Sequence, residues 1–257
     1  MKGPIPSELG RLTSLTFLAM YENQLNSSIP TELGHLTQLV SFFAYDNDLT
    51  VSLPSELGLL TELTIFSTYS NHITGTIPTE FGNIAQLLVI TVFTNNMTGP
   101  IPSELGRLTS LFYLDMSINM FSNTIPSEIG LMSHLQLFNV SLNQLTGTIP
   151  SVLGLLTGVS IFSTFSNHMT GSIPTELGNV DQMYAFSVFT NNMSGPIPSE
   201  LGRLTSLFYL DMSINMLSNT IPSEIGLMTQ LQLFNVSLNQ LTGTIPSALG
   251  LLYNLCK

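Results

Sequence analysis

The chain repeats one hydrophobic pattern every 24 residues. Each repeat contains a stretch of the form Leu15-x-x-Leu18-x-Met20-x-x-Asn23-x-Leu25, in which apolar residues alternate with other residues. Alternation of this kind is typical of a β-strand with one buried face, so Leu18 and Met20 are expected to point inward and the residues between them outward. The pattern therefore predicts one short strand in each repeat.

An asparagine follows each predicted strand at a fixed distance. Ten of them recur with the 24-residue period: Asn23, Asn47, Asn71, Asn95, Asn119, Asn143, Asn167, Asn191, Asn215 and Asn239. A turn at this point would bury main-chain groups without partners, and an amide offers both donors and an acceptor. We therefore expect each side chain to point inward and to bond its own coil and the neighbouring one, as a ladder.

The second part of each repeat predicts an extended stretch and then a short helical turn on the outer side, as in Leu145-Thr146-Gly147-Thr148-Ile149-Pro150-Ser151-x-Leu153-Gly154-x-Leu156. Glycine stands three residues before most of the repeated prolines, and Asn123 and Asn219 replace it in two repeats. Because glycine and asparagine tolerate positive φ, we expect a left-handed backbone there. Ser27 and Val51 break this rule, which predicts kinks in the second and third coils.

A longer repetition lies above the 24-residue one. Residues 99–146 match residues 195–242 with three differences, Phe121/Leu217, Ser133/Thr229 and His134/Gln230. The two segments begin 96 residues apart, which is four repeats. The surface of the second half is therefore expected to copy that of the first almost completely.

The repeat quoted above for residues 145–156 resembles the plant-type leucine-rich repeat of receptor-kinase ectodomains and polygalacturonase-inhibiting proteins, over essentially the whole chain. The resemblance implies an α/β solenoid, a right-handed superhelix with a concave parallel β-sheet and short helical turns on the convex side. We expect one domain over residues 1–257, with about ten repeats. The cysteine-paired caps of secreted relatives are missing, so both ends are expected to be truncated or uncapped.

The same resemblance implies a non-catalytic module that recognises a peptide or protein on the concave face, at the cell surface or outside the cell. The repeat pattern begins at Gly3, and on this ground we expect no secretory leader. Two alternatives stay open. One is an ice- or surface-binding protein that uses regular Ser, Thr and Asn rows, and the other is a fragment of a larger receptor-like kinase.

The outward strand position two residues before each asparagine is rich in aromatic side chains. Together with outward tyrosines and acids beside it, this position supplies the candidate ligand-binding residues: Tyr21, Tyr45, Tyr69, Phe93, Tyr113, Asp115, Phe165, Phe189, Tyr209 and Asp211. Phe17, Phe43, Glu22, Asp46 and Asp48 are expected on the same face. Rigid aromatic side chains are common binding anchors. Cross-strand stacking of the rings, with no ligand, is the alternative interpretation.

Charge narrows the choice of partner. Five Lys plus Arg against sixteen Asp plus Glu give a net charge of −11, which disfavours nucleic acid and favours a neutral or cationic partner. Nine acids form a separate row: Glu8, Glu32, Glu56, Glu80, Glu104, Glu128, Glu176, Glu200 and Glu224. Each follows Pro-Ser or Pro-Thr, where the charge suits a helix start and the hydroxyl is expected to cap free N–H groups.

Other classes of function lack support in the sequence. No apolar run approaches the roughly 18 residues of a membrane span, and the single Cys256 excludes an intramolecular disulfide. The histidines are dispersed, and His72 and His168 lie 96 residues apart at equivalent positions. We therefore predict no catalytic residues, no metal site and no cofactor, and hence that the chain is not an enzyme.

Overall fold

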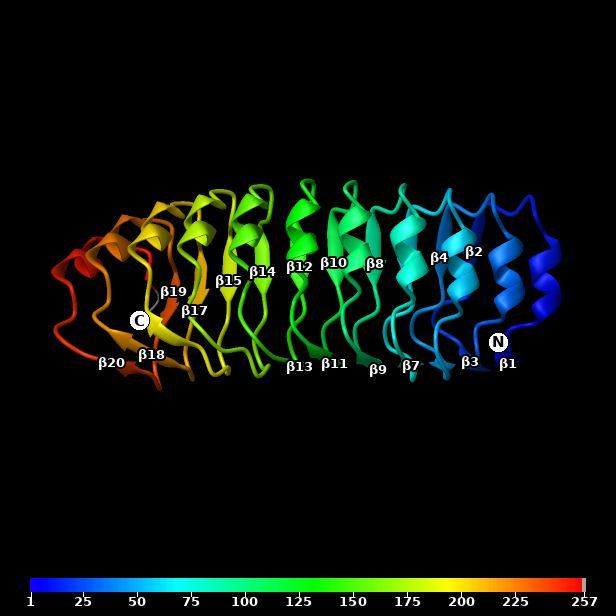
Figure 1. Cartoon of the computed structure of the whole chain (residues 1–257), viewed down its shortest axis with the longest axis horizontal. Helices are drawn as coiled ribbons and strands as arrows, with labels where there is room; N and C mark the ends of the chain where they lie inside the picture. The colour runs from blue at the N-terminus through cyan, green and yellow to red at the C-terminus, as the bar shows by residue number, and fades with distance from the viewer. Residues whose placement is uncertain (256–257) are drawn as a thin grey trace.

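A computed structural model describes residues 1–255, so Cys256 lies outside the described residues. The repeats form coils that stack side by side along the long axis of the molecule, in chain order from the N-terminus to the C-terminus (Figure 1). Each complete coil contains a strand of one long sheet, a second extended segment and a short 3₁₀ helix. The predicted fold class, a leucine-rich-repeat solenoid, is confirmed.

One long parallel sheet runs through the described coils. It pairs ten strands in chain order: β2 (Phe17–Ala19), β4 (Ser41–Phe43), β6 (Ile65–Ser67), β8 (Val89–Thr91), β10 (Tyr113–Asp115), β12 (Leu137–Asn139), β14 (Ile161–Ser163), β15 (Ala185–Ser187), β17 (Tyr209–Asp211) and β19 (Leu233–Asn235). The register places each residue opposite the one 24 positions later, as Tyr113 opposite Leu137. Equivalent side chains of successive repeats are therefore direct neighbours.

A second set of short parallel strands lies along the lower edge of the view in Figure 1. These strands are β1 (Lys2–Pro4), β3 (Gln24–Ser27), β5 (Asp48–Leu49), β7 (Thr74–Gly75), β9 (Asn96–Gly99), β11 (Met120–Asn123), β13 (Gln144–Leu145), β16 (Ser194–Pro196), β18 (Met216–Asn219) and β20 (Gln240–Leu241). They form three sheets of three, four and three strands. The extended stretch expected after each asparagine thus pairs with its neighbours over most of the chain.

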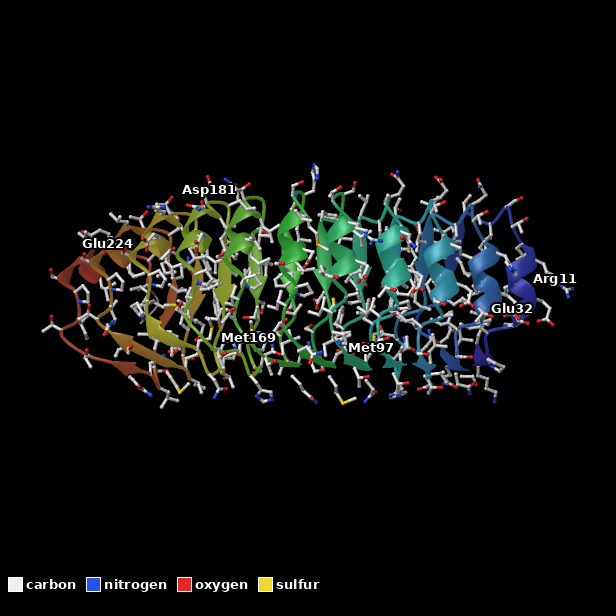
Figure 2. The ribbon with its side chains drawn as sticks, in the orientation of Figure 1. Arg11, Glu32, Met97, Met169, Asp181 and Glu224 are labelled. Carbon is white, nitrogen blue, oxygen red and sulfur yellow. The ribbon has the colours of Figure 1, made fainter. Side chains whose placement is uncertain are left out.

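The predicted helical turns are 3₁₀ helices of five residues. They are η1 (Ser7–Arg11), η2 (Thr31–His35), η3 (Ser55–Leu59), η4 (Thr79–Asn83), η5 (Ser103–Arg107), η6 (Ser127–Leu131), η7 (Ser151–Leu155), η8 (Thr175–Asn179), η9 (Ser199–Arg203), η10 (Ser223–Leu227) and η11 (Ser247–Leu251). Nine of them carry the glutamate row, with Glu32 and Glu224 labelled towards its two ends in Figure 2.

The expected hydroxyl cap of these helices is wrong. The residue before each helix is the proline, and no side chain caps the helix with a hydrogen bond, as at Pro126 before η6. The serine or threonine is already the first helical residue, and in eight of the described helices its hydroxyl donates instead to the next carboxylate, as Ser127 Oγ does to Glu128 Oε2 at 3.1 Å. The acids do lie in the first turn, where a negative charge is favoured.

The ladder asparagines join consecutive coils. Asn143 Nδ2 donates to Val140 O and Ser141 O of its own turn and to Met116 O of the preceding coil, each at 3.1 Å. Its Oδ1 accepts from the N–H of Phe121 at 2.9 Å. The eight asparagines from Asn47 to Asn215 are buried. One side chain thus satisfies main-chain groups on two coils that the turn would otherwise leave unpaired.

The coils also pack too tightly for a larger side chain at the glycine of each helix from η1 to η10. A Cβ atom added to Gly106 in η5 would lie 2.4 Å from the main-chain oxygen of Glu128 in η6. The apolar core is continuous through the stack, and Leu105, Leu114 and Met116 are completely buried in it. Two hydroxyls, Thr68 Oγ1 and Thr164 Oγ1, are buried there without a hydrogen-bond partner among the described residues.

The predicted left-handed backbone before the prolines is confirmed, and the predicted kinks are not. Gly147 has φ 72° and Asn123 has φ 65°, and Ser27 (67°) and Val51 (65°) adopt the same conformation. The neighbouring coils pair across both positions, as Thr50 N does with Ser27 O at 2.8 Å. A β-branched residue with positive φ is strained by about 1–2 kcal/mol. The second and third coils therefore accept local strain and keep their regular path.

Replacing Val51 by asparagine is expected to stabilise the protein by about 1 kcal/mol, because asparagine tolerates this conformation and already occupies it at Asn123 and Asn219. Val51 is 53% exposed, so little buried apolar surface is lost. Urea unfolding of Val51→Asn measures the change. The control is Val152→Asn, another exposed valine without positive φ, which is expected not to stabilise. Equal effects of both variants would contradict the strain at Val51.

Candidate ligand-binding face

The outward side chains of the long sheet form three rows along the stack, which we call the sheet face. The first row is Phe17, Ser41, Ile65, Val89, Tyr113, Leu137, Ile161, Ala185, Tyr209 and Leu233. The second row is Ala19, Phe43, Ser67, Thr91, Asp115, Asn139, Ser163, Ser187, Asp211 and Asn235. The third row is Tyr21, Tyr45, Tyr69, Phe93, Ser117, Ser141, Phe165, Phe189, Ser213 and Ser237. The three rows contain no Lys, Arg or His.

The aromatic residues of the third row stack on one another in two groups. Ring centroids are 4.5 Å apart for Tyr21 and Tyr45, 4.4 Å for Tyr45 and Tyr69, and 4.3 Å for Tyr69 and Phe93, with planes within 9° of parallel. Phe165 and Phe189 form a second pair at 4.3 Å. The first four rings are the aromatic ladder. Tyr45 and Tyr69 have a stacked ring on both faces, whereas Tyr21 and Phe93, at the two ends, each have a stacked ring on one face only.

Phe17 and Phe43 extend the aromatic ladder sideways at its N-terminal end. Phe43 meets Tyr21 and Tyr45 edge to face, with centroids 6.4 and 6.3 Å apart, and lies 5.6 Å from Phe17. Phe17 and Tyr21 are exposed. The structure thus gathers an exposed aromatic cluster at one end of the sheet face, beside the exposed acids Glu22 and Asp46.

The stack shifts the ionisation of its tyrosines. Burial raises the pKa of Tyr69 to about 12, with smaller contributions from Tyr45 and Asp46. Burial, together with Tyr21 and Glu22, also raises the pKa of Tyr45. The neutral phenols are favoured because a phenolate would lose solvation and meet negative neighbours. The aromatic ladder therefore stays uncharged at neutral pH, with the acids as the charged groups beside it.

One acid expected on this face lies elsewhere. Asp48 belongs to β5 in the second set of strands, where its Oδ1 is 3.9 Å from Nε2 of His72 in the next coil. The prediction for Asp48 was wrong for a simple reason. Asp48 follows the ladder asparagine Asn47, and the turn at that asparagine carries the chain away from the long sheet before Asp48 is reached.

Asp115 and Asp211 lie on the sheet face and are largely buried, at 9% and 7% exposure. Asp115 Oδ1 accepts from Ser117 N at 3.0 Å and from Ser117 Oγ at 2.6 Å, and Oδ2 accepts from Asn139 Nδ2 at 3.2 Å. Asp211 is held in the same way, with a further bond of 3.4 Å from the Tyr209 hydroxyl. Tyr113 and Tyr209 are half-buried beside these carboxylates, and burial followed by the nearby acid raises the pKa of each phenol.

Ser117, Asn139, Ser141 and their equivalents were not among the predicted site residues. Asn139 bridges Asp115 to Ser141, whose hydroxyl donates to Asn139 Oδ1 at 2.7 Å. The sequence does carry a sign of this network, because the same polar residues recur together 96 positions later. Residue type alone did not reveal it, since serine and asparagine occur throughout the chain.

The family model for the leucine-rich repeat matches residues 230–252. Over 99% of this chain, a crystal structure of a TDR receptor is 31% identical, with a TM-score of 0.95. The chain is a leucine-rich-repeat protein of the plant type. The structure of the Arabidopsis receptor kinase HAESA with the peptide hormone IDA and the co-receptor SERK1 is also similar, with 27% identity over 99% of this chain and a TM-score of 0.76.

This leucine-rich-repeat chain spans 44% of the TDR receptor chain and 55% of the HAESA chain. A plant ice-binding protein is a further similar structure, with 26% identity, a TM-score of 0.72, and coverage of 89% of this chain and 74% of that chain. A comparison with curated protein sequences finds no match.

No group of three or more His, Cys, Asp or Glu side chains in residues 1–255 is arranged to hold a metal ion. No helix among the same residues has both the length and the apolar character to cross a membrane.

Alkaline titration should show one tyrosine that ionises near pH 12, because the pKa of Tyr69 lies at about 12, above its ordinary value of 10.0. A raised pKa means that folding favours neutral Tyr69, so this contribution to stability is complete below pH 10 and is lost as the pH rises to about 12. Absorbance at the phenolate band measures it, and Tyr69→Phe should remove the late step. Completion of the titration near pH 10 in the folded protein would contradict the shift.

Proposed function

We propose that the sheet face binds an extended peptide or a protein surface that is neutral or cationic. The aromatic ladder carries this proposal, since it presents rigid, preorganised rings beside Glu22 and Asp46 on a face without Lys, Arg or His. Aromatic side chains lose little conformational entropy on binding, and already stacked rings lose less still. The role is recognition, and we propose no catalysis.

The dimensions suit a linear partner. Ten strands about 4.8 Å apart span roughly 45 Å, the length of about thirteen residues of extended peptide. The similarity to HAESA, whose structure contains a peptide hormone, supports the same class of partner. We propose further that the protein is a receptor-ectodomain segment or a free recognition module outside the cell.

The test is a selection of random twelve-residue peptides on the wild-type protein. Changing Tyr45, Tyr69 and Phe93 to serine is expected to lower the affinity for the selected peptides roughly tenfold or more, a loss of about 1.4 kcal/mol in binding free energy. The reason is that aromatic anchors dominate such interfaces. Fluorescence polarisation with labelled peptides measures the affinities, and circular dichroism checks the fold of the variant.

The matched control changes three exposed leucines of the helical side, Leu59, Leu131 and Leu155, to serine. This variant loses a similar number of exposed apolar side chains and leaves the sheet face intact. Its affinity should stay within about twofold of the wild type. Undiminished binding by the aromatic-ladder variant would remove that ladder as the site.

A second candidate function is ice binding, and the hydroxyl rows beside the prolines favour it. Thr76, Thr79, Thr124 and Ser127 line an open groove of ≈ 600 Å³, and similar grooves lie along the same side in other coils. Many post-proline hydroxyls already donate to glutamates, as Ser127 does. A second row of hydroxyl residues lies two positions before the prolines. Among the described residues, the hydroxyls of Thr124 and Thr148 in this row donate to no glutamate.

If ice is the ligand, wild-type protein should inhibit ice recrystallisation and produce thermal hysteresis. Thr124→Asn with Thr148→Asn should reduce both effects severalfold, because the regular spacing of small hydroxyl side chains is lost. The aromatic-ladder variant, altered on the other face, should keep them. Microscopy of ice grains and nanolitre osmometry measure the outcome, and no effect of the wild type on ice would end this candidate.

A further inference from the structure

The sheet face repeats itself every four coils. In the third row, two rings and two serines occur twice in succession: Tyr69, Phe93, Ser117, Ser141, then Phe165, Phe189, Ser213, Ser237. In the second row, two hydroxyl residues, an aspartate and an asparagine also occur twice: Ser67, Thr91, Asp115, Asn139, then Ser163, Ser187, Asp211, Asn235. Parallel pairing in register keeps both orders in space.

The hydrogen bonds repeat with the residues. Ser117 Oγ donates to Asp115 Oδ1 at 2.6 Å, and Ser213 Oγ donates to Asp211 Oδ1 at the same distance. Asn139 Nδ2 lies 3.2 Å from Asp115 Oδ2, and the equivalent distance to Asp211 is 3.1 Å. We name these constellations the first subsite, centred on Asp115, and the second subsite, centred on Asp211. A ligand group recognised by one is recognised by the other.

Each subsite holds a carboxylate without a cation. Asp115 and Asp211 form no ion pair within the described chain, and the sheet face has no Lys, Arg or His. A carboxylate has about four acceptor positions. The bonds at Asp115 use three of them, and Asp211 has the same three and a longer fourth bond of 3.4 Å from the Tyr209 hydroxyl. A largely buried carboxylate gains from a cation placed against it, because the surroundings screen the attraction weakly.

Each subsite also lies beside an aromatic face that carries no stacked ring. Phe93 stacks on Tyr69 from one side, and the next coil has Ser117 in place of a ring. Phe189 likewise stacks on Phe165, and Ser213 follows it. A guanidinium group favours a flat aromatic surface with a carboxylate near its edge, more than an ammonium group does. The exposed Ile118 and Ile214 offer apolar surface for the methylene stem of an arginine.

We infer that the two subsites bind two arginine side chains of one extended peptide, six residues apart. Four coils at about 4.8 Å separate Asp115 from Asp211 by roughly 19 Å, and six residues of extended chain cover about 20 Å. The inference rests on the proposed function, because it assigns the ligand chemistry of the same sheet face. It adds that binding is bivalent, with equal contributions from the two halves of the duplication.

The experiment uses three labelled twelve-residue Gly/Ser peptides. One carries arginine at the third and ninth positions, one at the third and sixth, and one at the third only. At low ionic strength the six-residue spacing should bind about tenfold or more tightly than either of the others, because only that peptide engages both subsites. Fluorescence polarisation measures the affinities, and added salt should reduce the advantage.

Asp115→Asn and Asp211→Asn should each lower the affinity for the six-spaced peptide to that of the single-arginine peptide. The asparagine keeps an oxygen for the serine bonds, so both variants are expected to fold, and circular dichroism checks this. The control is Asp46→Asn, which removes an exposed acid of the same face outside both subsites and should change affinity by less than twofold.

Equal binding of the two spacings, unequal effects of the two aspartate variants, or an Asp46 effect as large as theirs would overturn the inference. So would failure of all three peptides to bind the wild type. These results are separable from failure of the proposed function. Peptides from the random selection that depend on Tyr45 and Tyr69, and not on Asp115 or Asp211, would leave the proposed function in place and remove the two subsites.

Discussion

The architecture depends on one hydrogen-bonding arrangement, the asparagine amide that serves two coils at once. The chain must turn sharply after each strand of the long sheet, which buries main-chain N–H and C=O groups away from water. Asn143 donates to carbonyls of its own turn and of the previous coil, and accepts from an N–H of that coil. A coil of different length would leave these groups unpaired, so the 24-residue period and the strand register are maintained together.

The sheet face inherits its regularity from this constraint. Because equivalent residues lie in adjacent strands, identical side chains meet at the strand spacing, and rings at that spacing stack with their planes almost parallel. The Tyr45 and Tyr69 centroids, 4.4 Å apart, show the result. A stacked ladder is thus the default outcome of repeating an aromatic residue. Side chains that would select a particular ligand lie where the repetition changes, in the coils that have serine instead of a ring in the third row and Asp115 in the second row.

The sequence pattern predicted the strands, the helical turns and the left-handed positions before the prolines, because each follows from periodicity or from a residue type with a narrow conformational preference. A second left-handed row was not predictable in this way. Glu22, Thr94 and Ile118 precede ladder asparagines with φ of 52°, 55° and 53°, and none is glycine or asparagine. Bonds to the next coil impose that conformation, as Glu22 N to Tyr45 O at 3.0 Å. Tertiary pairing outweighs local preference there.

The same balance explains where the sequence-based interpretation failed. At Val51, kinking the coil would give up pairing with both neighbours, and this loss exceeds the strain of about 1–2 kcal/mol from positive φ. The burial of Asp115 also depends on residues that are remote in sequence, because its carboxylate accepts a hydrogen bond from Asn139 of the next coil. The 24-residue period was enough to predict that Asp115 lies on the sheet face. Its exposure depends on side chains of the neighbouring coil, so the period alone could not predict its burial.

Stacking of the rings is compatible with binding of a ligand. The stacking determines which ring surfaces stay free for a ligand to contact. A ring inside the aromatic ladder, such as Tyr45, has both faces covered by Tyr21 and Tyr69 and can offer only its edge. A terminal ring such as Phe93 keeps a face without a stacked partner in the described chain. Planar or cationic groups interact best with ring faces. The strongest contacts are therefore expected at the C-terminal ends of the stacked groups, at Phe93 and Phe189, where the next coil carries Asp115 or Asp211.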